Sequence, residues 1–383
     1  MARLLAENKS AIVAANTLDV AACPPDDAVI LDRLKVNEAK VDSMIASVRN
    51  VIDALDPVGK VISSHPREDG LRIENRQVPF GTILIIYEAR PDVSVEAAII
   101  ALKAGNKILL KGGKEARNTN LFLAGLWQQA LTENDADPNF VLYLDISREE
   151  TQALISGVTE KFDLVIPRGG ETLIDFVVKN SRAPVIVSGR GNNFAFIDEE
   201  ADLAMALKIA IDGKQRLSVC NALDKILIHH NWPDIESRMR KLAGDFQDIG
   251  IEVYGDNAAC EIDPSIRQIE DEAVWHEEFL AAKIVIGIVN NSSEAIEMIN
   301  NYSGGHSASI ITGNAETAAK FLEEADCAAV YHNASVRFTD GGQFGLGAEI
   351  AISTQKLHFR GPLGAENLLT NKWFIFGDGQ VRS

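Results

Sequence analysis

Apolar residues in the first part of the chain recur at helical spacing. They do so over residues 11–16 and 39–55, and Asp56-Pro57 interrupts the pattern. These stretches predict N-terminal helices. Residues 60–80 instead mix short alternating runs with turn residues such as Asp69-Gly70, which predicts an extended, hairpin-like excursion.

From residue 81 onward, apolar runs alternate with helical patterns. The predicted strands cover residues 82–87, 108–110, 140–144 and 162–166, with two more near Val185 and Phe194. The predicted helices follow Pro91, cover residues 114–131, and begin at Arg148 and Glu171. Such alternation predicts a mostly parallel sheet with helices on both faces and right-handed crossovers.

A second alternating series follows an amphipathic helix predicted over residues 201–211. Its predicted strands cover residues 225–228, 283–289, 309–311 and 328–331, and residues 373–376 form a terminal strand. We place the domain boundary near residues 216–220. Cys220 would then lie at a seam between two α/β domains, where small-molecule sites are common.

Composition and charge narrow the class of protein. The 383 residues suffice for two or three domains of ~150 residues each. With 37 Lys and Arg against 55 Asp and Glu, the formal net charge is -18, which argues against a nucleic-acid binder because its field repels a polyanion. Neither a secretion signal at Met1 nor an apolar run of membrane-spanning length is apparent, so we expect a cytoplasmic protein.

The chain has four cysteines without the spacing of a disulfide framework or a zinc site, so we expect no bound metal. The ordinary role of such a thiol is that of a small buried hydrophobe. Cys220, however, has Lys214 and Arg216 close by in sequence, which either form a solvated surface pair or favour the reactive thiolate. Because this segment has no histidine base, a substrate with a good leaving group suits it best.

Two glycine loops follow predicted strands and open predicted helices. They are Lys111-Gly112-Gly113-Lys114 and Ile166-Pro167-Arg168-Gly169-Gly170. Each is either a glycine turn with exposed bases or part of a site for an anionic cofactor, in which cations and a helix N-terminus converge. Their place at neighbouring strand ends favours the binding interpretation.

The segment from Asn333 to Gly347 is rich in glycine and contains Arg337 and Asp340. Glycines let a backbone approach a ligand closely, although a plain surface loop has a similar composition. Arg337 is the candidate for binding an anion, because a guanidinium pairs bidentately with carboxylate or phosphate.

These motifs resemble the gamma-glutamyl phosphate reductases (glutamate-5-semialdehyde dehydrogenases), a branch of the aldehyde dehydrogenase superfamily that acts in proline biosynthesis. The resemblance covers the chain from about Asn8 to Arg382. The matching runs are Tyr87-Glu88-Ala89-Arg90-Pro91, Lys111 to Ala116, Ile166 to Gly170, Gln215 to Asn221, and Asn333 to Lys356.

The resemblance implies NADPH-dependent reduction of L-glutamyl 5-phosphate to L-glutamate 5-semialdehyde and phosphate. Cys220 resembles the family's nucleophile, which forms a thioester, and Asn221 follows it in the catalytic set. The two glycine loops fall where the superfamily holds its nucleotide. The candidates for binding the substrate are Arg90, Asn333 and Arg337.

The family architecture implies two doubly wound, Rossmann-like α/β domains and a small β arm for oligomerisation. We assign residues 1–59 and 81–215 to the NADPH-binding domain, 216–345 to the catalytic domain, and 60–80 with 357–383 to the arm. The expected assembly is a homo-oligomer, with glutamate 5-kinase as a further candidate partner.

Two departures from aldehyde-oxidising relatives bear on the mechanism. Their water-activating glutamate would fall near Ser188-Gly189 and their oxyanion asparagine near Ala89, and neither is present. Asn193-Phe194 and Ala308 also depart from the family pattern, and His306 is expected to be structural. The alternatives are a hydrolytic or CoA-acylating aldehyde dehydrogenase, or a catalytically silent assembly subunit of the same fold.

Overall fold

The computed structural model describes residues 1–24, 27–157, 161–357 and 359–382 of the chain. Its contacts divide the chain into two compact units. Unit 1 comprises Met1–Ser188, Gly345–Ala351 and Pro362–Ser383, and unit 2 comprises Gly189–Phe344 and Ile352–Gly361. Each unit is built on its own parallel sheet.

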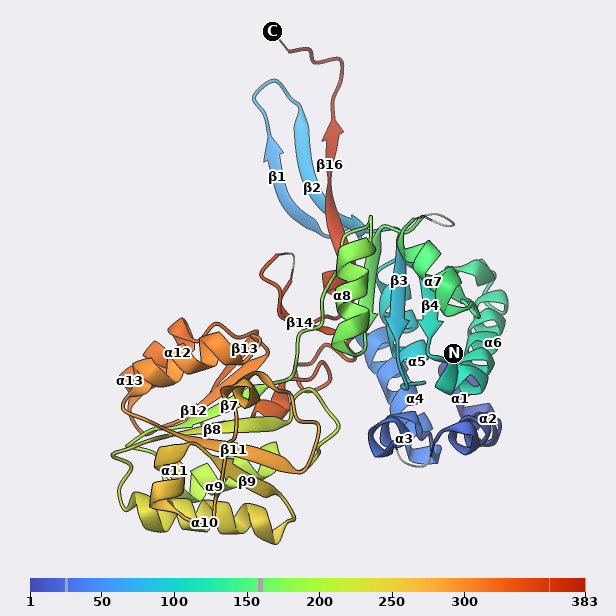
Figure 1. Cartoon of the computed structure of the whole chain (residues 1–383). Helices are drawn as coiled ribbons and strands as arrows, with labels where there is room; N and C mark the ends of the chain where they lie inside the picture. The colour runs from blue at the N-terminus through green and yellow to red at the C-terminus, as the bar shows by residue number, and fades with distance from the viewer. Residues whose placement is uncertain (25–26, 158–160, 358, 383) are drawn as a thin grey trace. The chain divides into compact units, whose positions relative to one another are not determined.

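Unit 1 contains a four-stranded parallel sheet in the order β5-β4-β3-β6 (Figure 1). The strands are β3 (Thr82–Tyr87), β4 (Lys107–Gly112), β5 (Val141–Tyr143) and β6 (Leu164–Arg168). The helical segments are α5 (Val93–Lys103), η1 (Lys114–Ala116), α6 (Arg117–Thr132), η2 (Pro138–Phe140), α7 (Arg148–Ile155) and α8 (Glu171–Asn180). The order of these elements confirms the predicted alternation of strands and helices, and the middle residues of the strands are apolar because both faces of the sheet are covered.

The two faces of the sheet belong to two different cores. Ile83 and Ile85 point into a large core shared with the N-terminal helices and α5. Leu84 and Ile86 point into a smaller core with residues of α7 and α8. Successive side chains of a strand point to opposite faces, so one apolar run supplies both cores.

Four helices precede the sheet and confirm the helical spacing of the N-terminal region. They are α1 (Ala2–Glu7), α2 (Lys9–Ala22), α3 (Ala28–Leu34) and α4 (Glu38–Asp53). Asp19 on α2 accepts hydrogen bonds from the backbone N–H groups of Asn118 (3.0 Å) and Thr119 (2.8 Å) at the start of α6. This buried carboxylate neutralises free donors at a helix N-terminus and fixes α2 against α6.

The predicted excursion is an antiparallel sheet of β1 (Val61–Pro66), β2 (Arg72–Pro79) and β16 (Leu369–Phe376), which we call the arm (Figure 1). The last strand was assigned to it as part of residues 357–383, of which 358 and 383 lie outside the described residues. Residues 362–368 differ from that assignment. They carry η5 (Ala365–Leu368), and Leu363 and Leu368 are fully buried in the core of unit 1.

Unit 2 is built on a seven-stranded parallel sheet in the order β10-β9-β11-β8-β7-β12-β13 (Figure 1). The strands are β7 (Asn193–Ile197), β8 (Leu223–His229), β9 (Glu252–Gly255), β10 (Arg267–Gln268), β11 (Lys283–Val289), β12 (Ser307–Ile311) and β13 (Ala329–His332). The helical segments are α9 (Leu203–Gly213), α10 (Ile235–Asp248), α11 (Asn257–Ile262), η3 (Glu272–His276), α12 (Ser292–Tyr302), α13 (Ala315–Glu324) and η4 (Val336–Phe338). Two short strands, β14 (Ile352–Ser353) and β15 (Gly361–Pro362), pair with each other.

The boundary between the two units lies closer to the N-terminus than we predicted, at residue 189. Residues 189–215, which we assigned to the cofactor domain, belong to unit 2. The reason is strand pairing: β7 lies between β8 and β12 and is buried along its whole length. The strand expected near Val185 is reduced to a single bridge with Val165.

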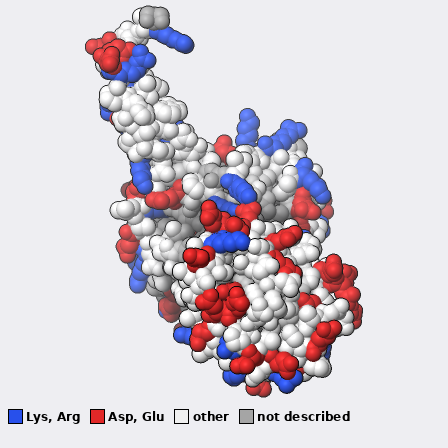
Figure 2. Space-filling model, turned by 90° about the vertical axis from the view of Figure 1, so that its left-hand side faces the viewer, with Lys and Arg blue, Asp and Glu red and all other residues white. Residues whose placement is uncertain are grey.

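The surface drawn in Figure 2 carries acidic and basic side chains interspersed with each other, with several groups of Asp and Glu over its lower part. This distribution accords with the formal net charge of -18. Among the described residues, no helix is both long and apolar enough to cross a membrane.

Candidate functional site

Cys220 lies in unit 2, in the loop that joins α9 to β8. The residues around it form a turn, in which the backbone N–H of Ala222 donates to the carbonyl oxygen of Val219 at 3.1 Å. The thiol is half-buried and forms no disulfide. Cys220 therefore departs from the ordinary role of a fully buried cysteine, which Cys327 fulfils here.

Asn221 and Arg337 are brought together although they lie far apart in sequence. The amide nitrogen of Asn221 donates to the carbonyl oxygens of Arg337 (3.0 Å) and Thr339 (3.1 Å). In return, the Arg337 guanidinium donates to the side-chain oxygen of Asn221. The loop that carries Cys220 is thus tied to η4.

Arg337 also places a cation near the thiol. Partial burial lowers the pKa of Arg337, while the nearby Asp212 carboxylate and Cys220 favour its charged form. An arginine stays protonated throughout the physiological range, so its charge is permanent. A permanent cation within electrostatic reach of Cys220 favours the thiolate over the thiol.

Lys214 does not act as the sequence suggested. Its side chain is fully buried, and its ammonium group donates to the Asp224 carboxylate at 2.6 Å. The other carboxylate oxygen of Asp224 accepts from the backbone N–H of Phe279 at 2.8 Å. Lys214 is therefore neither a surface cation nor a partner of Cys220, but half of a buried ion pair.

Asn333 is hydrogen-bonded through its side chain to the backbone of Thr312, which follows β12. Its side-chain oxygen accepts from the Thr312 N–H and its amide nitrogen donates to the Thr312 carbonyl oxygen, both at 3.0 Å. The residue adopts a left-handed backbone conformation with φ 55°. Both polar atoms of the Asn333 side chain are therefore engaged by the Thr312 backbone, which makes this side chain less available to a substrate than we expected.

The two glycine loops lie at one edge of the sheet of unit 1. Lys111 is the second-last residue of β4. Its ammonium group donates to the Gly112 carbonyl oxygen at 2.8 Å, and burial lowers its pKa. Arg168 ends β6, and β3 lies between these two strands. Gly113 precedes η1, which begins at Lys114, and Gly170 caps α8. The loops therefore flank the carboxyl end of β3, the edge at which open α/β sheets bind ligands.

Two carboxylates hold backbone donors at this edge. Glu115 accepts from the N–H of Ala89 at 2.6 Å, and Glu88 accepts from the N–H of Gly170 at 3.2 Å. Gly169 approaches Glu88 closely enough that a Cβ would lie 2.7 Å from its carboxyl carbon. Backbone N–H groups that hold a carboxylate have the polarity to hold a phosphate, but Glu115 and Glu88 occupy these two donors, so a cofactor phosphate would bind them only by displacing those side chains.

Arg90 follows β3 in the same part of unit 1. Burial opposes ionisation of Asp92, but Lys40, Arg90 and Arg168 together keep the pKa of this carboxyl below its usual range. The Arg90 and Arg168 charges thus act on one buried carboxylate. The structure brings together the substrate candidate Arg90 and the cofactor candidate Arg168.

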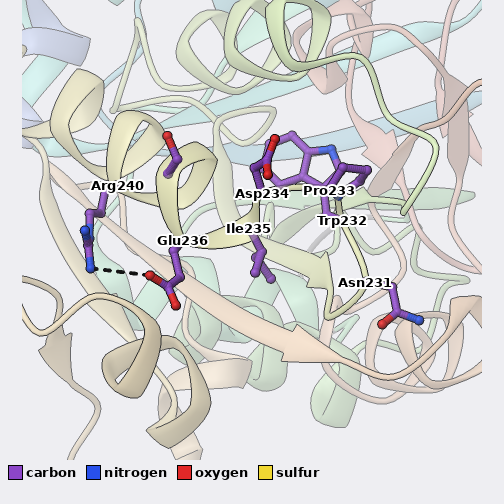
Figure 3. Close-up of a pocket in the computed structure, with 8 residues that line it drawn as sticks. Asn231, Trp232, Pro233, Asp234, Ile235, Glu236 and Arg240 are labelled. Carbon is purple, nitrogen blue, oxygen red and sulfur yellow. Dashed lines mark ion pairs between the residues drawn. The ribbon is translucent and has the colours of Figure 1, made fainter.

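Two cavities of about 650 Å³ each lie elsewhere in unit 2. One is formed by the loop before α10 and its first turns, including Trp232 and Asp234, with a Glu236–Arg240 ion pair of 3.8 Å on its rim (Figure 3). The other contains Phe279 and Lys283. Neither lining includes Cys220 or Arg337, so neither cavity adds to the candidate site.

The sequence did not indicate directly that several polar residues around the Cys220 loop are buried. Asp224 and Lys225 are almost completely buried in β8, and Asn192 and Asn193 are fully buried just before and within β7. A signal was present, since two charged residues precede the apolar run of β8. Burial without a partner is costly, so such residues imply partners that the sequence does not name.

His306 is completely buried just before β12, and burial lowers its pKa to about 4. The unfolded chain, with an ordinary histidine pKa of 6.5, binds more protons than the folded chain between these values. We therefore predict that this residue makes the free energy of unfolding fall by up to about 3 kcal/mol as the pH drops from 6.5 to 4.

Urea unfolding of the parent and of His306→Asn across this pH range measures that contribution. The variant should have the shallower pH dependence, and His65→Asn, at an exposed position, should leave it unchanged. Equal slopes for the parent and both variants would contradict the prediction.

Known proteins with similar sequences cover the whole chain. The sequence model of the aldehyde dehydrogenase family matches residues 32–268 and 253–347. Gamma-glutamyl phosphate reductase of Thermotoga maritima is 43% identical over 390 residues, which cover 100% of this chain and 92% of that protein. The enzyme of that name from Bacillus mycoides is 42% identical over 354 residues, 92% of this chain and 85% of its own length.

Solved structures extend the likeness to the fold. The crystal structure of the Thermotoga maritima gamma-glutamyl phosphate reductase superposes with a TM-score of 0.91 over 100% of this chain and 92% of that one. An acetylating aldehyde dehydrogenase from Geobacillus thermoglucosidasius, 17% identical, shares the fold with a TM-score of 0.73 over 100% of this chain and 91% of its own. The chain therefore belongs to the aldehyde dehydrogenase family, in its gamma-glutamyl phosphate reductase branch.

Proposed function

We propose that this protein reduces L-glutamyl 5-phosphate to L-glutamate 5-semialdehyde with NADPH and releases phosphate, as a cytoplasmic enzyme of proline biosynthesis. The observation that carries the proposal is a half-buried cysteine, Cys220, whose chain neighbour Asn221 accepts a hydrogen bond from the permanent cation of Arg337. Relatives named gamma-glutamyl phosphate reductase at 43% identity support the choice of substrate.

In this mechanism the Cys220 thiolate attacks the acyl carbon of the substrate. A carbon–sulfur bond forms, the bond from the acyl carbon to the phosphate oxygen breaks, and phosphate leaves with the electron pair. Phosphate is a good leaving group, so this step needs no side chain to protonate it, in accord with the absence of a histidine near Cys220 in sequence. Asn221 holds the Arg337 guanidinium by a hydrogen bond, which keeps this charge within electrostatic reach of Cys220.

The side chains of Lys111 and Arg168 would hold the cofactor's phosphates, and the Gly170 N–H would become a further donor if it exchanged its bond to Glu88 for one to the cofactor. When bound, the reduced nicotinamide supplies the hydride that converts the thioester into the aldehyde and frees the Cys220 thiolate. The cations Lys111, Lys114 and Arg168 support a preference for NADPH, whose extra phosphate adds negative charge.

Running the reaction backward tests the proposal. Purified protein with glutamate 5-semialdehyde and NADP should produce NADPH only when inorganic phosphate is added, because phosphate must take the acyl group from Cys220. Phosphate-independent turnover to free glutamate would identify a hydrolytic enzyme instead, and CoA-dependent turnover an acylating one. An absence of turnover under all three conditions would support the catalytically silent subunit.

We further propose that the arm mediates a homo-oligomer. Trp373 and Ile375 on β16 are at least half exposed, as is Ile62 on β1, so this small sheet carries several large exposed apolar side chains, and such side chains mark an interface where they form one patch. Sedimentation of the intact chain at micromolar concentration should give a mass above that of one chain, and a monomer would refute the proposal. Glutamate 5-kinase is the proposed second partner, since it would supply the acyl phosphate directly.

A further inference from the structure

A buried amide holds the backbone on both sides of Asn221. Asn193 lies at the start of β7 with no exposed surface. Its side-chain nitrogen donates at 2.7 Å to the carbonyl oxygens of both Cys220 and Ala222, and it lies 2.9 Å from the Gly191 carbonyl oxygen. One side chain of the sheet thus determines where the loop with Cys220 passes.

His306 fixes the orientation of this amide. With its nitrogen directed at three carbonyl oxygens, Asn193 presents its side-chain oxygen to Nδ1 of His306 at 2.9 Å. An amide oxygen only accepts, so Nδ1 carries the hydrogen of the neutral imidazole. Nε2 of His306 is buried and has no partner among the described residues. The histidine therefore acts through Nδ1, as a donor to Asn193.

The network continues beyond the histidine and returns to the same loop. The Ser307 hydroxyl lies 2.8 Å from Nδ1 of His306 and 2.7 Å from the Thr339 hydroxyl. The carbonyl oxygen of Thr339 accepts from the side chain of Asn221 at 3.1 Å. The loop is therefore held through the Cys220 backbone by β7 and through the Asn221 side chain by the residues after η4.

Gly191 packs tightly against the backbone of Cys220. A Cβ at this position would overlap the carbonyl group of Cys220, so the backbone before β7 lies directly against the Cys220 backbone. The close contact with Gly191 and the hydrogen bond from Asn193 leave the Cys220 carbonyl little room to move. The orientation of the thiol then depends on a network of fully buried side chains.

We propose that Asn193 and His306 are positioning residues for the Cys220 nucleophile, with His306 holding the Asn193 amide and Asn193 holding the Cys220 backbone. The inference rests on the proposed function of Cys220. Its physical basis is that attack on an acyl carbon requires the sulfur within a narrow range of distance and angle. A displacement of about 1 Å, even by a distant change, can lower turnover by about 100-fold.

Two substitutions at His306 separate this role from a general contribution to stability. In His306→Asn the amide nitrogen takes the place of Nδ1 and still donates to Asn193, whereas His306→Leu fills the space without a donor. Asn193→Asp keeps the shape but replaces the donor to Cys220 and Ala222 by an acceptor. Asn106→Asp is the matched control: Asn106 is fully buried, joins the Gly81 N–H (2.9 Å) to the Leu368 carbonyl oxygen (2.8 Å), and lies in unit 1.

The measurement is the phosphate-dependent reverse reaction, with kcat and KM determined per folded molecule after urea unfolding has established the stability of each variant. We expect His306→Leu and Asn193→Asp to lower kcat by about 100-fold with little change in KM. His306→Asn should restore kcat to within about threefold of the parent, a difference of less than 1 kcal/mol in the barrier. Asn106→Asp should lower stability without this selective loss of kcat.

Equal kcat values for His306→Leu, His306→Asn and the parent would overturn the proposal. Failure of both His306→Leu and Asn193→Asp to fold would also overturn it, since the network would then stabilise unit 2 as a whole. The proposed function fails by a different result, namely full activity of a variant that lacks the Cys220 thiol. Each failure can therefore be recognised separately.

Discussion

Cys220→Ala is expected to abolish the phosphate-dependent reaction, with a fall in kcat of at least about 1000-fold. Removing a nucleophile leaves only binding and electrostatic stabilisation, because the covalent route through the thioester is lost. The half-buried position of Cys220 makes the fold tolerant of the change, since little apolar volume is removed. The rate of NADPH formation from the semialdehyde, NADP and phosphate measures the loss.

The chain provides its own control for this experiment. Cys260 is also half-buried, but burial raises the pKa of its thiol and nearby carboxylates oppose its ionisation. Cys260→Ala should keep kcat within about threefold of the parent, less than 1 kcal/mol. In the parent, iodoacetamide at neutral pH should alkylate Cys220 faster than Cys23, Cys260 or Cys327. Unchanged turnover of Cys220→Ala would exclude it as the nucleophile.

The largest expected effect on stability comes from the buried ion pair of Lys214 and Asp224, which flank the Cys220 loop in sequence. Asp224→Ala leaves the fully buried Lys214 ammonium without its partner and removes the acceptor for the Phe279 N–H. Breaking a buried pair in this way costs about 3–5 kcal/mol, because the remaining charge has neither water nor a counter-charge. Urea unfolding, followed by a probe in unit 2, should therefore show a much lower midpoint.

A double replacement distinguishes the pair from simple loss of packing. Lys214→Met with Asp224→Asn removes both charges at nearly constant volume and retains an amide oxygen that accepts from the Phe279 N–H, so most of the stability should return. Asp245→Ala breaks the surface pair between Lys241 and Asp245, in which the Lys241 side chain is 55% exposed, and should cost less than about 1 kcal/mol. A loss for Asp224→Ala no larger than that for Asp245→Ala would contradict the prediction.

Many helices and strands of this fold were predictable because the spacing of their apolar side chains reflects which face of each element is buried. The predicted strands 82–87 and 283–289 coincide with β3 and β11. β9 was missed, because its four residues combine an acidic residue and a glycine with a single buried valine and yield no periodic pattern. Its strand conformation comes from pairing with β11 and β10, which lie later in the chain.

For the candidate site, the sequence predicted individual residues but not the contacts between them. The sequence identified Cys220, Asn221 and Arg337 separately, through their motifs and the family resemblance. It left two interpretations for Lys214, a solvated surface residue or a cation that favours the Cys220 thiolate. Only the folded chain places Asp224 against Lys214 and excludes both interpretations.

By itself, the sequence determined the α/β class of both units, the arm strands, the glycine loops at neighbouring strand ends and the cysteine at the centre of the proposed chemistry. The tertiary structure decided that β7 belongs to unit 2, that Asn221 holds Arg337, and that Asn193 and His306 support the Cys220 loop. The reason is physical: helix and strand patterns depend on neighbouring residues. The contacts of Asn221 with Arg337 and of His306 with Asn193 join residues 116 and 113 positions apart, which only the packing of the sheet brings together.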